Sequence, residues 1–191
     1  ATQARKRLPN DSYSAKMFDF VKTKYEANIP WEKTRDMVYH KYQVMQEDGY
    51  DLTSKNLHCN GCFAAGINFA SSIISLLYGE GDIQKTIKIG TLCGWDSDNP
   101  TSTWGGLIGF MIGKEGIEKS FGRKFGENYN IHRTRIGFPN KGMDTFSNMA
   151  KMGVYVVDRV VQKQIEGGID LEKDLWYIPN VGINIVAGSP L

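Results

Sequence analysis

The chain has 191 residues, of which 41% are hydrophobic, 12% aromatic and 23% charged, and its formal net charge is +2. This length suits one domain or slightly more, and the aromatic content excludes a chain that is mostly disordered. The balanced charge argues against a dedicated nucleic-acid binder or a polybasic membrane binder, and no apolar run approaches the roughly 20 residues of a membrane-spanning helix.

The first third of the chain is expected to hold a short arm and two helices. Residues 1–12 are polar and basic and contain a proline, so we expect a flexible basic arm. A first helix is predicted over 13–27, and a second begins after Ile29 with Pro30 in its first turn. The apolar face of the second helix is expected to comprise Trp31, Val38, Tyr42 and Met45.

Two further helices are predicted in the middle of the chain. Residues 61–78 carry an apolar stripe at helical spacing, which predicts a central and mostly buried helix. That stripe comprises Phe63, Ile67, Ala70, Ile74 and Leu77. After a glycine turn, Asp82 is a suitable N-cap for a helix over 83–93.

The second half of the chain is predicted to contain two long helices separated by a glycine-rich stretch. Pro100 opens a helix to about residue 112, and a short helix is expected around 117–121 within irregular residues 114–142. The last helix is expected over 144–166 and is ended by two glycines. Its expected inner face comprises Phe146, Met149, Gly153, Val156 and Val160.

These patterns predict an all-α fold, with residues 13–191 forming a single domain. Alternation typical of strands is weak throughout the chain. The tail from residue 170 onward contains Trp176, Tyr177 and Ile178, so we expect it to pack against the domain.

The loop over 94–99 is the most informative stretch for function. Asp96 and Asp98 lie two residues apart, so in an extended loop their carboxylates converge on one point. Two such carboxylates repel each other unless a proton or a cation lies between them. Their hard oxygen atoms suit Mg²⁺, Mn²⁺ or Ca²⁺ rather than zinc. The alternative is that Asp98 or Asn99 only caps the following helix, with Asp96 solvated beside it.

Glycines recur at every fourth position behind this loop, at Gly105, Gly109 and Gly113. Each glycine costs about 1 kcal/mol of helix propensity relative to alanine, so the repeat needs a reason. Glycine lets another backbone or a ligand approach closely, and close helix packing is the favoured explanation.

The three cysteines are expected to act mainly as small hydrophobic residues. Cys59 and Cys62 form a C-x-x-C pair at a predicted helix start, without the second pair that a zinc site needs or the βαβ setting of a thioredoxin-like site. An odd cysteine count argues against a disulfide framework and for a reducing compartment, so we expect a cytoplasmic location.

Residues 58–113 resemble the C-terminal part of the ADP-ribosylglycohydrolase family, which includes the dinitrogenase-reductase-activating glycohydrolase. That family has a Gly-Asp turn, a helix, a G-[GW]-D-[ST]-D-x loop and a glycine-rich helix. This chain supplies Gly81-Asp82, a helix over 86–93, the loop Gly94-Trp95-Asp96-Ser97-Asp98-Asn99, and Gly105-Gly106-Leu107-Ile108-Gly109.

The resemblance implies an orthogonal helical bundle with two divalent cations, Mg²⁺ or Mn²⁺, that hydrolyses N- or O-glycosidic bonds of ADP-ribosyl groups. Asp96 and Asp98 match the family's late metal ligands, and Asn99 takes the place of its usual threonine ligand. An amide oxygen can replace a hydroxyl there, although Asn99 before Pro100 is also a natural N-cap. The expected substrate contacts are Trp95, Gly105, Gly106 and His58.

The family's other metal ligands, a Glu and a Thr/Ser-Asp-Asp run, come from an N-terminal half, and this sequence has no Asp-Asp pair. We therefore expect the C-terminal part of a larger glycohydrolase-like domain, whose N-terminal ligands are either on a companion polypeptide or lost. The alternative is a non-catalytic ADP-ribose-binding or structural protein of the same fold. The expected partner is an ADP-ribose-containing substrate rather than a nucleic acid or a membrane, and no residue is assigned as the catalytic base.

Overall fold

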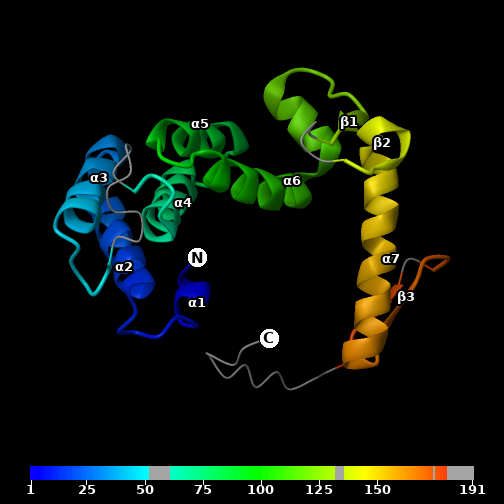
Figure 1. Ribbon diagram of the computed structural model, residues 1–191, viewed down its shortest axis with the longest axis horizontal. Helices are drawn as coiled ribbons and strands as arrows, with labels where there is room; N and C mark the ends of the chain where they lie inside the picture. The colour runs from blue at the N-terminus through cyan, green and yellow to red at the C-terminus, as the bar shows by residue number, and fades with distance from the viewer. Residues whose placement is uncertain (52–60, 132–135, 174, 180–191) are drawn as a thin grey trace. The chain divides into compact units, whose positions relative to one another are not determined.

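The computed structural model describes residues 1–51, 61–131, 136–173 and 175–179 (Figure 1). The chain divides into two compact units, the first of which holds residues 1–123, while the second begins at Lys124. The expected domain over 13–191 is thus two units in this structure.

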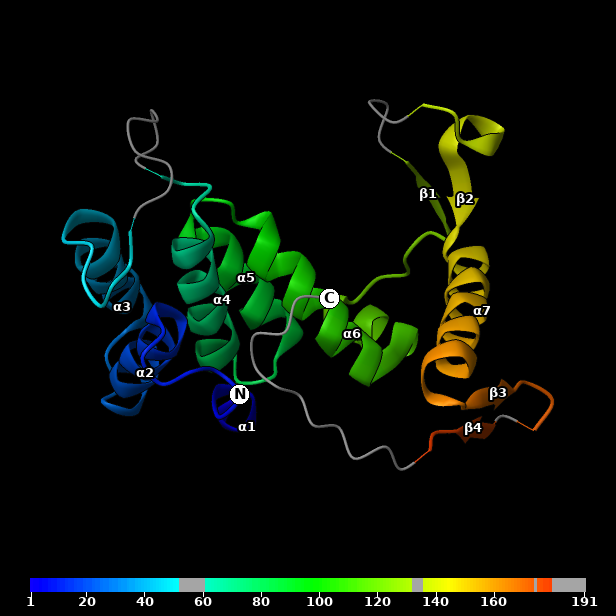
Figure 2. The same cartoon turned by 60° about the horizontal axis from the view of Figure 1, so that its bottom comes forward.

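The first unit is helical, which confirms the predicted all-α class. Its elements, in chain order, are α1 (Thr2–Arg5), α2 (Tyr13–Glu26), α3 (Trp31–Val38), the π-helical η1 (Tyr39–Val44), α4 (Ala65–Gly79), α5 (Ile83–Cys93) and α6 (Asp98–Phe121). Helix α4 lies in the middle, with α2 and α3 on one side and α5 and α6 on the other (Figure 2).

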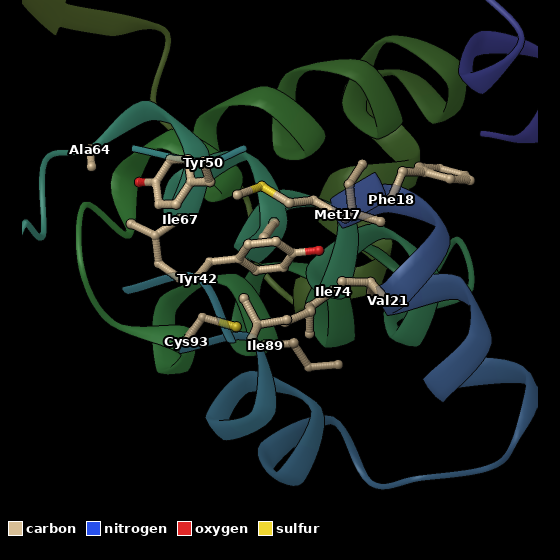
Figure 3. Packing of buried hydrophobic residues seen from close by; sticks show 13 residues of the cluster. Met17, Phe18, Val21, Tyr42, Tyr50, Ala64, Ile67, Ile74, Ile89 and Cys93 are labelled. Atoms are coloured by element: carbon tan, nitrogen blue, oxygen red, sulfur yellow. The ribbon is translucent and has the colours of Figure 1, made fainter. Parts of the chain in front are cut away.

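The core of this unit is built around α4, as the apolar stripe predicted. Ile67, Ala70 and Ile74 are fully buried, and they pack with Val21 of α2 and Tyr42 of η1 (Figure 3). Phe63, the first member of the predicted stripe, is 67% exposed because α4 begins only at Ala65. The stripe therefore located the central helix correctly and overestimated its length at the N-terminal end.

The second predicted helix changes its winding halfway. From Tyr39 onward the hydrogen bonds follow the π pattern, and the Met45 N–H bonds the His40 carbonyl at 3.0 Å. Val38 and Tyr42 are buried as expected, whereas Met45 is 56% exposed. A π-helix has more residues per turn than an α-helix, so a position chosen at a period of 3.6 has left the buried face by Met45, at the end of this element.

The N-terminal arm is attached to the helical unit. Arg5, in the last turn of α1, forms a salt bridge of 2.7 Å with Asp19 of α2 and also donates to Asn10 at 3.2 Å. Residues 1–12, expected to be a flexible arm, thus contain a short helix and an ion pair with the bundle, a long-range contact that local composition does not reveal.

Helix α5 follows its predicted bounds because its N-terminal signal is local. The carboxylate of Asp82 accepts a hydrogen bond from the Lys85 N–H at 2.6 Å, as an N-cap does. Helix α6 begins differently, since Ser97 occupies its N-cap position without a side-chain capping bond.

Substituting Asp82→Ala should therefore lower the free energy of unfolding by about 1 kcal/mol, the usual cost of losing a cap. Ser97→Ala is the matched control and should change stability by less than about 0.5 kcal/mol, because no cap is lost. Urea unfolding followed by circular dichroism measures both. Equal losses from the two substitutions would show that the Asp82 cap contributes nothing specific.

Two predicted helices are joined in α6. The helix runs through to Phe121, but Gly113 has φ 68° and ψ 175°, which no helix adopts, and the chain kinks there. The helices expected at 100–112 and 117–121 are the two arms of α6 on either side of this glycine.

The second unit contains short strands that the sequence patterns did not predict. It contains two antiparallel pairs of short strands, a 3₁₀ turn and one long helix. These elements are β1 (Asn128–Asn130) paired with β2 (Met143–Thr145), η2 (Pro139–Gly142), α7 (Phe146–Ile165), and β3 (Gly168–Asp170) paired with β4 (Leu175–Tyr177).

The predicted inner face of α7 is exposed within this unit. Phe146, Met149, Val156 and Val160 are between 44% and 53% exposed. The tail residues expected to pack are exposed as well: Trp176, Tyr177 and Ile178 at 49%, 67% and 65%. Helical periodicity identifies an apolar face but not whether another element covers it. Among the described residues, no helix is both long and apolar enough to cross a membrane.

Candidate functional site

The candidate site is the short connection between α5 and α6. Gly94 has φ 87° and Trp95 has φ 54°, so two successive residues take left-handed backbone conformations. Such a conformation is uncommon for a bulky residue such as tryptophan, and strained conformations of this kind are frequent at functional sites. The turn brings Asp96 back over the first residues of α6.

The carboxyl groups of Asp96 and Asp98 converge, but across a turn and not along the extended loop expected from their spacing, because Ser97 is in the αR region and Asp98 begins α6. The Asp98 side chain lies within hydrogen-bonding reach of Asp96, and this contact is the main cause that raises the pKa of Asp96. Partial burial and the negative charge of Asp98 raise that pKa further, while Asn99 opposes them. The pair therefore favours a shared proton or a bound cation over two free negative charges.

Asn99 holds Asp96 in this arrangement. Its Nδ2 donates to Asp96 Oδ2 at 2.6 Å and approaches the Asp96 carbonyl at 3.3 Å. Helix α6 begins at Asp98 with Ser97 as its N-cap, so Asn99 lies inside the first turn rather than at the cap. Asn99 thus orients the Asp96 carboxylate, and it is not the N-cap of α6.

Two residues outside the loop fix it, and the sequence analysis missed both. The buried Asn68 of α4 accepts a hydrogen bond from the Asp96 N–H at 3.1 Å. The Trp95 indole stacks on Tyr39, with ring centroids 6.2 Å apart and planes inclined by 18°. Neither contact has a local signal, because Asn68 is 28 positions from Asp96 and Tyr39 is presented by the π-helical turn.

The glycines behind the loop differ in how much room surrounds them. A Cβ at Gly109 would lie 3.1 Å from Ile117 of the same helix, so this glycine lets the two arms of α6 pack across the kink at Gly113. Gly105 has ordinary room, since its nearest neighbour, Ile87, would lie 3.6 Å away, and Gly106 is exposed with nothing within 4 Å. The repeat is therefore not a uniform seam for close helix packing, and Gly106 presents bare backbone to open space.

The cysteines divide into two kinds. Cys93, at the end of α5, is a buried free thiol whose pKa is raised to about 12 by burial, so it behaves as the expected small hydrophobic residue. Cys62 is disulfide-bonded, contrary to that expectation. This disulfide removes the cysteine-based argument for a reducing compartment.

Two of the predictions on site residues concern His58 and a cluster of metal ligands. His58 lies in the stretch 52–60, outside the described residues. Within the part of the chain that the structure describes, no cluster of three or more His, Cys, Asp or Glu side chains suited to a metal is found. The described residues thus bring two carboxylates together at the loop, Asp96 and Asp98, without a third ligand side chain of these types beside them.

Comparison with protein families identifies a family that this chain matches. The model of a family described as ADP-ribosylglycohydrolase matches residues 3–140 of the 191. The matched segment includes α2 to α6 and the acidic loop, and it ends before α7. No curated protein and no solved structure matches the chain.

Proposed function

Since the chain belongs to the ADP-ribosylglycohydrolase family, whose members hydrolyse ADP-ribose linkages, we propose that it cleaves the N- or O-glycosidic bond of an ADP-ribosyl group with the help of Mg²⁺ or Mn²⁺. The observation that supports the metal dependence is the convergence of Asp96 and Asp98. Carboxylates forced together in an accessible loop are the arrangement that a hard divalent cation relieves.

Each loop residue has a role in this proposal. Asp96 and Asp98 are the metal ligands, and Asn99 orients Asp96 through its Nδ2. The family resemblance adds the Asn99 amide oxygen as a third hard donor. A cation held by these residues would polarise the ribose hydroxyls of the substrate. The family resemblance implies two cations in the complete site.

The substrate is expected to lie over the loop and the start of α6. Trp95 is partly exposed beside the carboxylates and is held from behind by Tyr39, so it offers a fixed aromatic surface. Gly106, with nothing within 4 Å, allows a ligand to contact the helix backbone, with Gly105 beside it. We also include His58 among the proposed substrate contacts, because the family resemblance implies it.

The remaining ligands belong, in this proposal, to a companion polypeptide. The α6 surface beyond the loop supports this, because Leu107, Phe110 and Met111 are 50%, 88% and 75% exposed. Apolar side chains grouped on one helix are typical of a surface that another protein covers.

The proposed activity is tested with two peptides, one carrying an N-linked and one an O-linked ADP-ribosyl group. The purified protein, with any companion polypeptide that copurifies, should release ADP-ribose from at least one of them in Mg²⁺ or Mn²⁺. Chelation with EDTA should abolish the release, and re-addition of metal should restore it. Release that is unaffected by EDTA would contradict the metal dependence.

A non-catalytic ADP-ribose-binding protein is the second candidate. The observation that favours it is that only two carboxylates converge among the described residues, so no third acid there is placed to activate water. This candidate predicts saturable, metal-dependent ADP-ribose binding without release from either peptide. Turnover of either peptide would exclude it.

A further inference from the structure

Asn68 connects the acidic loop to the chain segment that precedes α4. Its Oδ1 accepts the Asp96 N–H at 3.1 Å, while its Nδ2 donates to the carbonyls of Cys62 at 2.8 Å and Ala64 at 3.0 Å. The side chain is buried, with 7% of the residue exposed. One amide thus bonds one donor and two acceptors from backbone segments far apart in sequence.

Only an amide side chain satisfies this set of partners. A carboxylate could accept the Asp96 N–H but would place its second oxygen against the two carbonyls. An apolar side chain would make none of the three bonds, and the Ala64 carbonyl would keep only its bond from the Asn68 backbone N–H at 3.3 Å. A buried polar group left unpaired costs about 1–3 kcal/mol, so the contact has a defined geometric purpose.

The anchored N–H belongs to the residue that follows the left-handed turn at Gly94 and Trp95. Without an anchor, the like charges of Asp96 and Asp98 would be relieved by rotation of this turn, because repelling carboxylates move apart when the backbone allows it. The bond from Asn68 restrains the backbone at the position where that rotation would occur.

We propose that Asn68 is a positioning residue of the metal site, which holds the Asp96 backbone so that its carboxylate stays directed toward Asp98 before a cation binds. The proposal rests on the proposed function for the identity of the ligand, Mg²⁺ or Mn²⁺. Asn68 itself does not bind the cation. Partners of this kind, outside the ligand shell, typically change metal affinity by about 10- to 100-fold when they are removed.

Two variants separate positioning from stability. Asn68→Leu removes every bond, whereas Asn68→Asp keeps an oxygen toward the Asp96 N–H but opposes the Cys62 and Ala64 carbonyls. Asn68→Leu should weaken Mn²⁺ binding by about 10- to 100-fold, and Asn68→Asp should retain more of the affinity although it is the less stable protein. The matched control is Ser71→Ala, which removes a buried hydroxyl that bonds only the Ile67 carbonyl of α4 and should leave the affinity unchanged.

Binding is measured from the free Mn²⁺ signal in electron paramagnetic resonance, and the anchor itself from amide hydrogen exchange at Asp96. The Asp96 N–H should be protected in the native chain and should exchange faster in Asn68→Leu. Native-like Mn²⁺ affinity in Asn68→Leu, or an unprotected Asp96 N–H in the native chain, would overturn the proposal. If the native chain binds no Mn²⁺, the cation site is wrong, and hydrogen exchange alone then decides whether Asn68 fixes the loop.

Discussion

Replacing Asp96 with asparagine is expected to reduce Mn²⁺ affinity by more than about 100-fold, because the change removes a charged ligand rather than a supporting residue. Asp98→Asn should have an effect of the same order, since the two carboxylates form one site. Mn²⁺ titration followed by electron paramagnetic resonance measures the affinity. Melting temperatures recorded with Mn²⁺ and with EDTA give an independent measure.

The order of the melting temperatures of Asp96→Asn and the native chain should be reversed between EDTA and Mn²⁺. In EDTA the variant should melt at or above the temperature of the native chain, because the raised pKa of Asp96 means that its ionised form is disfavoured in the fold. That destabilisation is absent at low pH and appears as the pH rises through this pKa, so the comparison is made at neutral pH. In Mn²⁺ only the native chain gains stability from binding, and the order is reversed.

Asp82→Asn is the matched control for this experiment. It also removes one carboxylate near α5, but asparagine caps a helix as well as aspartate does. Its response to Mn²⁺ should equal that of the native chain. A Mn²⁺-dependent rise in melting temperature that persists in Asp96→Asn and Asp98→Asn would place the cation elsewhere.

Replacing Gly79 with alanine is expected to have the largest effect on stability, a loss of about 3 kcal/mol in the free energy of unfolding. Gly79 is the buried last residue of α4, where the chain turns into α5. A Cβ there would lie 2.8 Å from the Cα of Thr86, a backbone atom that cannot move without shifting α5. The buried Thr86 hydroxyl has no hydrogen-bond partner, so moving it breaks no hydrogen bond, and the expected loss comes from the clash with the α5 backbone.

Gly106→Ala is the contrasting substitution. A Cβ at Gly106 meets nothing within 4 Å, so the change should raise helix stability by up to about 1 kcal/mol. Chemical denaturation of both variants tests the pair. Two losses of similar size would mean that the close approach of α4 and α5 at Gly79 is not a significant packing constraint.

The features that sequence predicted well have local signals. Asp82 capping α5 and the buried stripe at Ile67 and Ile74 each follow from residues within a few positions of one another. Spacing alone is enough to determine such features, because helical and extended backbones fix where neighbouring side chains point.

The features that sequence missed depend on distant contacts. Asn68 reaches Asp96 only because α4 packs beside the α5–α6 loop, and Tyr39 reaches Trp95 from a π-helical turn that breaks the expected period. The face of α7 was identified correctly as apolar, but its burial was not, since Met149 remains 44% exposed in its unit. Periodicity describes one element at a time and carries no information on its neighbours.

The central claim is that Asp96 and Asp98 hold a divalent cation at a site for ADP-ribose. Calorimetric titration of ADP-ribose into the native protein, in Mn²⁺ and in EDTA, tests it most directly. Binding should be saturable in Mn²⁺ and should be lost in EDTA and in Asp96→Asn. Binding of equal strength in EDTA, or binding in Mn²⁺ that Asp96→Asn leaves unchanged, would contradict it.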